Sequence, residues 1–431
     1  MSSELPRLAI VYPPVDLPFL AIVEAGRGEW ETLWVLTGDD REVYKDVRAL
    51  HRFGTVVDVT SLPIPDAARE IARHRPDGIT AFRTEEFAVT SMLAQELSLP
   101  FHDEATVACL TDKRAQREAM AAAGLPVPRF WSLPPVSSLP EVDRHRLDQL
   151  VSDVQLPVVV KPGTGASSRN VTRAATTEEL RRVVEMLLPD EPSGLVFEEI
   201  LHDAWQRTAK PFADFLSVES VITDSVIHHV AVTGRFPLAE PYREAGCFIP
   251  ANIGPDDTSA VQECAARAIR AVGIRTGCTH TEIKLTPDGP RVIEVNGGLG
   301  GEIPDLVRLS TDQSIFTLVG RSALGLHPTS DAPLTSKRIS YLWNVLPPMD
   351  ATSLLAVHGY DEAGRVAGVD SIHLRKEPGD SVSWREGTVG YVACITGVVA
   401  SLRHEDLWEV IDTLGSIISM DFAMHVDATS E

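Results

Sequence analysis

Two alternating segments joined by a turn place a pair of glutamates opposite each other in the second half of the chain. The segments are residues 281–285 and 291–296, and Thr286-Pro287-Asp288-Gly289 connects them. Period-two alternation on both sides of a Pro-Asp-Gly turn indicates a β-hairpin. Pairing that is symmetric about Asp288 sets Glu282 directly across from Glu294. The other face would be buried, and its residues are Ile283, Leu285, Ile293 and Val295.

The two facing glutamates need a compensating positive charge. Like charges directly opposite each other in a sheet, with Cβ atoms about 5 Å apart, destabilise the pairing. Asn296 lies two residues beyond Glu294 on the same face, so the three side chains offer only oxygen ligands. Such a set suits Mg²⁺ or Mn²⁺ and suits zinc poorly. The alternative is a solvated acidic hairpin at the edge of a sheet.

Length and charge narrow the class of protein. A chain of 431 residues is too long for one ordinary core and predicts about three domains. A formal net charge of −22 argues against a nucleic acid partner, because binding phosphate backbones needs concentrated Lys and Arg. The five cysteines are scattered without a C-x-x-C pair, which is typical of reduced thiols in cytoplasm. Without a signal-peptide pattern or a long apolar run, we expect a cytoplasmic protein with no membrane span.

The first hundred residues alternate apolar strands with helical stretches. Strands are expected at residues 8–11, 32–36, 56–59 and 78–82, and helices at 66–73 and 86–97. This order predicts a small doubly wound α/β domain. Tyr12-Pro13-Pro14 follows the first strand, where a dinucleotide fold needs G-x-G-x-x-G, so we assign no dinucleotide to this domain.

A second segment carries a loop rich in glycine and serine. A helix begins near Lys113, and further along an apolar strand leads into a loop over residues 161–170. Backbone N–H groups of such a loop, the hydroxyls of Ser167 and Ser168 and the charge of Lys161 can bind phosphate oxygens. The loop is not G-x-x-x-x-G-K-[ST], which excludes a P-loop NTPase. Taken alone, the loop is also compatible with an ordinary turn.

In combination these features resemble the ATP-grasp superfamily. They are Asp112-Lys113 before a helix, Lys161-Pro162-Gly163 with its loop, Glu198-Glu199-Ile200-Leu201 after an apolar strand, and the hairpin with Glu282, Glu294 and Asn296. Within that superfamily the chain looks most like the carboxylate-amine ligases that include bacterial L-amino acid ligases and carnosine synthase. That likeness is carried by residues 279–284, by residues 296–301 and by Gly379-Asp380.

The resemblance implies a mixed α/β and α+β architecture. An ATP-grasp fold would lie between an N-terminal doubly wound α/β domain and a C-terminal α+β lid or extension domain. The expected boundaries are 1–106 for the first domain, 107–325 for the ATP-grasp core and 326–431 for the last domain. Within the core, residues 107–200 would form the small lobe with the Gly/Ser loop, and residues 201–325 the lobe that binds metal and substrate.

The resemblance also implies roles in an ATP site. Lys113 and Lys161 would contact the phosphates, with Gly163, Ser167 and Ser168 in the loop that closes over them. Glu198 and Leu201 would meet the adenine, largely through backbone, with Glu199 beside it. Mg²⁺ or Mn²⁺ would be held by Glu282, Glu294 and Asn296. The residues expected to take part in catalysis are Lys161, Glu282, Glu294, Asn296 and Arg308.

One position departs from the pattern of the resembled group. Those relatives usually carry an arginine two residues after the metal-binding asparagine, where it contacts the acyl phosphate or a substrate carboxylate. Here that position is Gly298. Either another cation, such as Arg243, Arg169 or Arg308, replaces it, or the substrate differs from that of the usual dipeptide ligase.

Four residues are candidates for contact with substrate. By the resemblance Glu244 would meet a substrate amino group, with Arg243 beside it, and Arg308 is a candidate for a carboxylate. An ordinary exposed charged loop around Arg243 and Glu244 is the alternative. His280 lies on the same face as Glu282 and would either approach the site or serve a structural role.

The implied reaction is ATP-dependent formation of an amide or peptide bond through an acyl phosphate, with release of ADP and phosphate. Activating a carboxylate needs charges that neutralise the triphosphate and hold it in line, and a site closed to water. The expected partners are a carboxylate of an amino acid or specialised metabolite and an amine, with no nucleic acid and no membrane, and a homodimer is left open. The alternatives are a carboxylase, a ligase with a non-amine acceptor, or a catalytically silent nucleotide-binding regulator.

Overall fold

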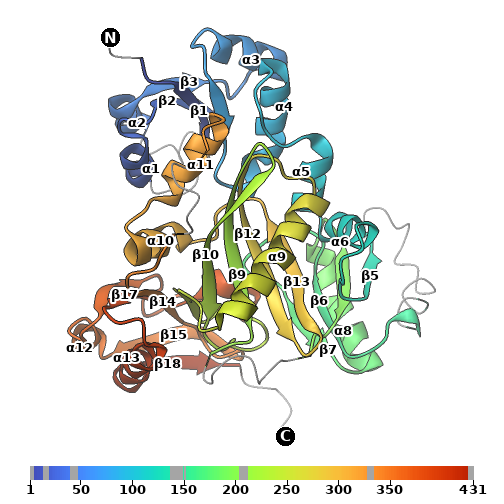
Figure 1. Ribbon diagram of the computed structural model, residues 1–431. Helices are drawn as coiled ribbons and strands as arrows, with labels where there is room; N and C mark the ends of the chain where they lie inside the picture. The colour runs from blue at the N-terminus through green and yellow to red at the C-terminus, as the bar shows by residue number, and fades with distance from the viewer. Residues whose placement is uncertain are drawn as a thin grey trace, which may run out of the picture.

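The structure is a computed structural model that describes residues 4–12, 19–38, 47–135, 149, 152–202, 212–327 and 334–425. Figure 1 shows the N-terminal domain at the top in blue, a small lobe at the right in green, and the last strands and helices at the lower left in orange and red. These parts surround a large central sheet. The predicted mixed architecture is confirmed by this arrangement of sheets and helices.

The N-terminal domain is a four-stranded parallel sheet, as its alternating pattern predicts. The strands are β1 (Arg7–Tyr12), β2 (Glu31–Leu36), β3 (Thr55–Asp58) and β4 (Gly78–Thr80), in the order β3-β2-β1-β4. The covering helices are α1 (Phe19–Gly26), α2 (Val47–Phe53), α3 (Ile64–Ala72) and α4 (Phe87–Leu97). Apolar side chains of β1 point into both hydrophobic clusters beside the sheet, which explains why its sequence is continuously apolar.

The small lobe begins after two consecutive helices, α5 (Glu104–Thr111) and α6 (Lys113–Ala122). Asp112 begins α6 because its carboxylate accepts hydrogen bonds from the backbone N–H groups of Arg114 and Ala115. The lobe's antiparallel sheet has the order β5-β8-β6-β7, with α8 (Thr177–Leu187) packed against it. Its strands are β5 (Phe130–Leu133), β6 (Val158–Pro162), β7 (Thr172–Ala174) and β8 (Leu195–Glu199).

The central sheet has eight strands in the order β13-β12-β9-β10-β11-β14-β17-β16. Its first part consists of β9 (Phe215–Thr223), β10 (Val226–Arg235), β11 (Gly246–Ile249), β12 (Gly277–Thr286) and β13 (Gly289–Asn296), with α9 (Pro255–Ala271) packed on β13. The second part consists of β14 (Ile339–Val345), β16 (Val369–Leu374) and β17 (Ala393–Val399). The sheet therefore continues across the boundary predicted at 325/326, and the three-domain division stays a prediction.

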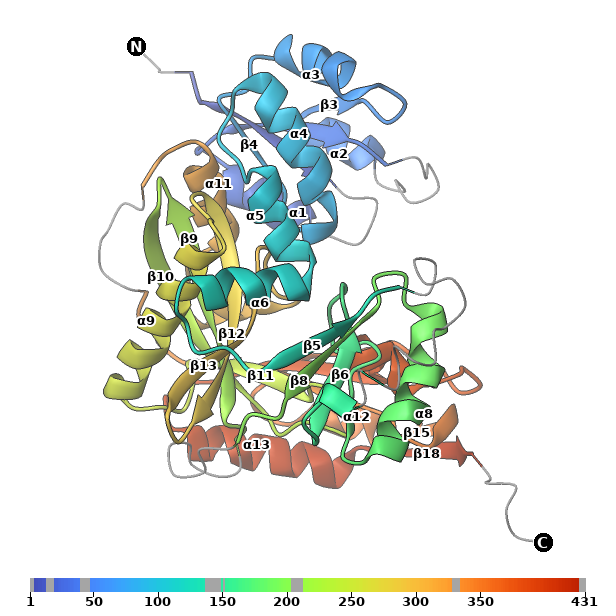
Figure 2. The same ribbon diagram turned by 90° about the vertical axis from the view of Figure 1, so that its right-hand side faces the viewer.

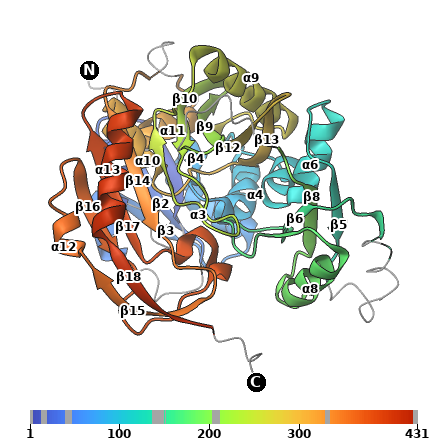
Figure 3. The ribbon, with the colours of Figure 1, turned by 90° about the horizontal axis from the view of Figure 1, so that it is seen from below.

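The remaining elements connect the central sheet to its surroundings. Helices α10 (Ile303–Thr311) and α11 (Ile315–Ala323) follow the hairpin, and α11 packs against α1 of the N-terminal domain (Figure 2). Seen from below, α13 (His404–Ile417) lies beside β14 and β17 (Figure 3). The other C-terminal elements are β15 (Ala351–His358), α12 (Tyr360–Ala363) and β18 (Ser419–Met424). Across the described ranges, no helix combines the length and apolarity that crossing a membrane requires.

Candidate active site

The hairpin of β12 and β13 pairs Glu282 with Glu294, and this prediction is confirmed. We call these two residues the glutamate pair. Their register arises differently from the predicted symmetry. The turn is tighter, because Thr286 pairs with Gly289, and a β-bulge at Ile293 then adds the residue that restores the glutamates to opposite positions.

The bulge also changes which side chain of β13 enters the core. Val292 is 1 % exposed, whereas Ile293 is only half-buried. The prediction that Ile293 lies on the buried face is therefore wrong, because the extra residue of the bulge breaks the period-two alternation at this point. Ile283, Leu285 and Val295 are buried as predicted.

Lys113 reaches the glutamate pair from the first turn of α6. Its Nζ lies 2.9 Å from Oε1 of Glu294 and donates to the backbone carbonyl of Gly165 at 2.7 Å. Burial would raise the pKa of Glu294, but the charges of Lys113 and Lys161 outweigh burial and lower it. Glu294 is therefore ionised at neutral pH and is held by cations from α6 and β6.

Lys161 is held by a buried charge cluster at the end of β6. Its Nζ lies 2.6 Å from Oε2 of Glu198 on β8, and Nε of Arg117 on α6 donates to Oε1 of the same carboxylate at 2.9 Å. Burial would raise the pKa of Glu198, but the two cations lower it to about 2. Arg117 also donates to the carbonyl of Ile293 at the bulge. Sequence reasoning missed Arg117, although it lies four residues after Lys113 on the same face of a helix.

Glu282 is the member of the pair for which nearby positive charge does not outweigh burial and the neighbouring carboxylates. Burial, followed by the charges of Glu244 and Glu294, raises the pKa of Glu282 to about 7. A divalent cation would relieve this repulsion, and the two carboxylates with the amide oxygen of Asn296 offer the hard oxygen ligands that Mg²⁺ prefers. The residues therefore fit the ion. Within the described ranges, His, Cys, Asp and Glu side chains by themselves form no group of three or more that could hold a metal ion.

A buried polar cluster adjoins the glutamate pair on β9, β10 and β12. Nδ1 of His280 lies 2.9 Å from Oε2 of Glu219, and Nη2 of Arg235 lies 3.2 Å from Nε2 of His280. Nε of Arg235 in turn lies 3.3 Å from Oε2 of Glu244. Nε2 of His280 is 3.8 Å from Oε1 of Glu282, so the predicted candidates His280 and Glu244 are connected to the glutamate pair.

Sequence reasoning missed Glu219 and Arg235. Glu219 lies directly opposite His280 in the β9–β12 pairing, and its carboxylate also accepts from the hydroxyls of Ser217 and Thr233. The available signal was the period-two spacing of polar residues, Ser217 with Glu219 and Thr233 with Arg235, in two strands, β9 and β10.

The Gly/Ser loop and the end of β8 lie beside Lys161. Ser167 and Ser168 have left-handed backbone conformations, with φ of 59° and 55°, and Gly163 is pressed against the backbone carbonyl of Ser193. Glu199 accepts from Nε of Arg129 at 2.6 Å, and Leu201 is half-buried after the strand. The nucleotide-binding roles of these residues stay predictions.

The three arginines considered as replacements at Gly298 have other partners. Arg243 donates to the backbone carbonyls of Glu240 and Pro347. Arg308 is exposed on α10, where it pairs with Asp305 at 3.3 Å, and Arg169 makes two hydrogen bonds of 2.9 Å to Glu191. Their substrate and catalytic roles stay predictions. The cation that contacts Glu244 is Arg235.

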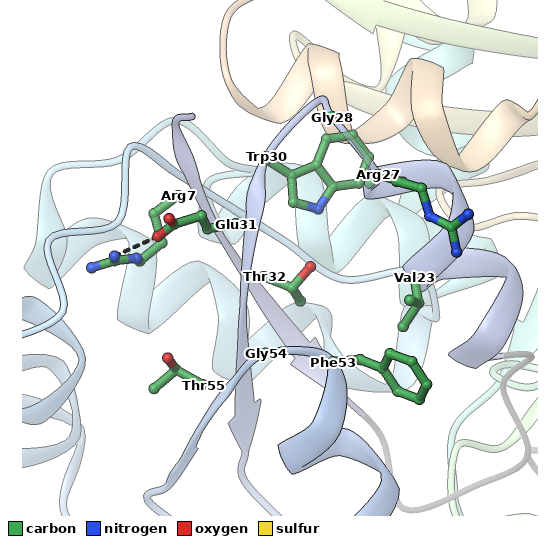
Figure 4. A pocket seen from close by; sticks show the side chains of 11 residues that line it. Arg7, Val23, Arg27, Gly28, Trp30, Glu31, Thr32, Phe53, Gly54 and Thr55 are labelled. Atoms are coloured by element: carbon green, nitrogen blue, oxygen red, sulfur yellow. Dashed lines mark hydrogen bonds and ion pairs between the residues drawn. The ribbon is translucent and has the colours of Figure 1, made fainter. Parts of the chain in front are cut away.

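A separate pocket of about 400 Å³ lies in the N-terminal domain (Figure 4). It is lined by Trp30, Phe53 and Thr55, with the ion pair of Arg7 and Glu31 at its edge. These residues belong to β1, β2, α2 and β3 and their connections, so the pocket is distinct from the glutamate pair on the central sheet.

Comparisons with known proteins show which families and folds this chain is similar to. Residues 119–301 match the family described as D-ala D-ala ligase C-terminus. The chain is 26% identical over 323 residues to the uncharacterized protein y4rH of Sinorhizobium fredii, covering 74% of this chain and 63% of that protein. It is 30% identical over 192 residues to the D-alanine–D-alanine ligase of Mycolicibacterium smegmatis, covering 43% of this chain and 49% of that enzyme. The chain thus spans between about half and two thirds of these relatives' length.

The fold is similar to that of the L-amino acid ligase from Bacillus licheniformis, with a TM-score of 0.72 at 19% identity over 98% of this chain and 100% of that one. The chain therefore has the ATP-grasp fold and an ATP-grasp domain, and the predicted resemblance to that superfamily is confirmed. Residues 119–301 are also the part of the chain that is similar in sequence to this ligase domain.

Proposed function

We propose that this chain is an ATP-dependent ligase that joins a carboxylate to an amine and releases ADP and phosphate. The observation that carries the proposal is the position of two buried lysines, one on α6 and one on β6, beside the glutamate pair of the central sheet. Lys113 contacts Glu294 directly, and the charge of Lys161 also acts on Glu294. Cations on one side and oxygen ligands on the other suit a triphosphate that binds together with a divalent ion.

In the proposed reaction, Lys113 and Lys161 neutralise and orient the triphosphate for transfer of its γ-phosphoryl group to a substrate carboxylate. The amine then attacks the acyl phosphate, and phosphate leaves as the amide forms. When bound, Mg²⁺ would be held by Glu282, Glu294 and Asn296 and would neutralise the charge of the transferring group. In this proposal Glu244, which pairs with Arg235, would receive a substrate amino group, and that role would favour an amino acid among the candidate acids.

The test is a matrix of candidate acids and amines, read by ADP release and by product mass. We expect ADP release that requires an acid and an amine together, and hydroxylamine should trap the acyl phosphate when the amine is omitted. Formation of AMP and pyrophosphate would contradict the proposal. Dependence on bicarbonate would favour a carboxylase, and ATP binding without turnover would favour a regulator.

A matched pair of variants ties turnover to the glutamate pair. Glu294→Gln should lower ADP release roughly a hundredfold or more, because it removes a charge that acts on the reacting phosphates. Glu178→Gln is the control, since Glu178 is exposed on α8. Equal activity of the two variants would refute the assigned site.

A further inference from the structure

The Gly/Ser loop is hydrogen-bonded to a segment that follows it by 215 residues in the chain. This segment is η4 (Trp384–Gly390), from the C-terminal part of the protein. The backbone N–H of Thr388 donates to the carbonyl of Ser167 at 2.8 Å, and the N–H of Asn170 donates to the carbonyl of Arg385 at 3.3 Å. Nε of Arg385 also donates to Oδ1 of Asn170 at 3.0 Å.

The contact between the loop and η4 is made along the backbone and leaves no room for a side chain at Gly387. A Cβ atom on Gly387 would lie 2.2 Å from the carbonyl oxygen of Ser167 and 2.6 Å from the nitrogen of Arg169, and φ of Gly387 is +71°. Asn170, with φ of 55°, adds a third left-handed position to those of Ser167 and Ser168. Such a loop conformation is sterically costly and needs partners that hold it.

Thr388 also contacts the loop that carries the candidate substrate residue. Its Oγ1 accepts a hydrogen bond from the backbone N–H of Glu244 at 3.0 Å. The same threonine therefore joins the Gly/Ser loop through its own N–H and the Glu244 loop through its hydroxyl. Thr388 is partly buried, so both hydrogen bonds are shielded from water.

These hydrogen bonds complete a chain of contacts around the glutamate pair. On the nucleotide side, Glu294 contacts Lys113, which donates to Gly165 in the Gly/Ser loop. On the substrate side, Glu244 contacts Arg235, which reaches Glu282 through His280. Thr388 lies where the two sides meet.

We propose that Thr388 is a positioning residue that couples the Gly/Ser loop to the Glu244 loop, so that closure over the phosphates also orders the substrate side. This inference rests on the proposed ligase function. Thr388 acts through the Ser167 carbonyl and the Glu244 N–H, with no contact of its own with the reacting atoms. This coupling of the two loops would protect the acyl phosphate, which water would hydrolyse if the substrate side stayed open while ATP reacted.

The first test measures hydrogen–deuterium exchange of the full-length protein without nucleotide. Thr388→Val keeps the branched shape and the backbone N–H but removes the acceptor for Glu244, whereas Thr388→Ser keeps the hydroxyl. In Thr388→Val we expect the Glu244 amide to exchange about fivefold faster, as loss of one hydrogen bond implies, with wild-type exchange in Thr388→Ser. Wild-type exchange in Thr388→Val would overturn the coupling.

Gly387→Ala provides a second variant that separates η4 from the loop by bulk. Its control is Gly325→Ala, because Gly325 has a φ of +69° and a Cβ atom added there would meet no atom within 4 Å. Faster exchange of residues 163–170 in Gly387→Ala, without such a change in Gly325→Ala, is the expected result. Equal exchange in the two variants would overturn the backbone contact on which the coupling depends.

The second test measures turnover as ADP released per amide formed. Thr388→Val should release several-fold more ADP per amide than wild type and Thr388→Ser, with ATP affinity within about twofold, since one hydrogen bond outside the nucleotide site is lost. An unchanged ratio in Thr388→Val would overturn the inference. A wild-type protein that forms no ADP with any acid and amine would refute the proposed function, and the exchange measurement, which needs no turnover, would still decide the coupling.

Discussion

Glu198→Gln removes the carboxylate shared by Arg117 and Lys161 with little change in shape. Glu198 has a side chain that is only 6% exposed, and its pKa falls from 4.5 to about 2. At about 1.4 kcal/mol for each tenfold change in the protonation equilibrium, this corresponds to about 3 kcal/mol in favour of the ionised form. The uncharged variant should lose a similar free energy of unfolding, because two buried cations then lack their shared partner.

Urea-induced unfolding at neutral pH measures this loss, with Glu178→Gln as the exposed control that should stay within about 0.5 kcal/mol of wild type. The pKa of Glu198 is lower in the folded state than its ordinary value, so its contribution is present above pH 4.5 and is lost as the pH falls toward about 2. The difference between wild type and Glu198→Gln should therefore shrink below pH 4.5. A variant as stable as wild type at pH 7, or a difference that does not depend on pH, would refute the reasoning.

Two further variants test the packing of the N-terminal domain and α6 against the central sheet. Burial lowers the pKa of His102 from 6.5 to about 4, so its contribution to stability is present above pH 6.5 and is lost as the pH falls toward 4. The free energy of unfolding of His102→Gln in urea should therefore depend less on pH over this range than that of wild type. Parallel pH profiles of the two proteins would contradict this prediction. The side-chain amide of Gln116 donates to the carbonyl of Val295 and accepts from its N–H. Gln116→Leu should therefore lower the free energy of unfolding by about 2 to 3 kcal/mol in the same assay, whereas Gln95→Leu, at an exposed position, should stay within about 0.5 kcal/mol of wild type. Equal stability of the two variants would contradict this prediction.

The glutamate pair was predictable because a hairpin is a local structure. Alternation and a Pro-Asp-Gly turn were enough to place Glu282 opposite Glu294. The sequence pattern does not distinguish a symmetric hairpin from a tighter turn followed by a bulge, because both give this pair. The two differ on the turn side of the pair, where Ile283 faces Val292 and Val292 is buried in place of Ile293.

The contacts that support the pair could not be predicted, since they join distant segments. Arg117 and Glu198 are 81 residues apart, and Glu219 and His280 are 61 residues apart. Thr388 and Glu244 are separated by 144 residues. Thr388 lies in the C-terminal part of the chain, where Gly379-Asp380 was the one motif recognised. The continuation of the central sheet into β14 was not predicted for the same reason. The pairing of β11 with β14, in which Ile249 faces Ser340, has no local signal in the sequence.

Gly298 illustrates how the tertiary structure changes the meaning of a missing residue. A Cβ atom at this position would lie 2.9 Å from the carbonyl oxygen of Phe82 in the N-terminal domain, so an arginine there would require that domain to move. Arg235 instead brings a cation toward the site from β10, and it is 2% exposed between Glu244 and His280. Arg235 is paired with Glu244, so under the proposed function its charge would act on the substrate side of the glutamate pair. Under the proposed function, the acid panel should therefore include carboxylates other than those of simple dipeptide precursors, because position 298 carries no cation in this chain.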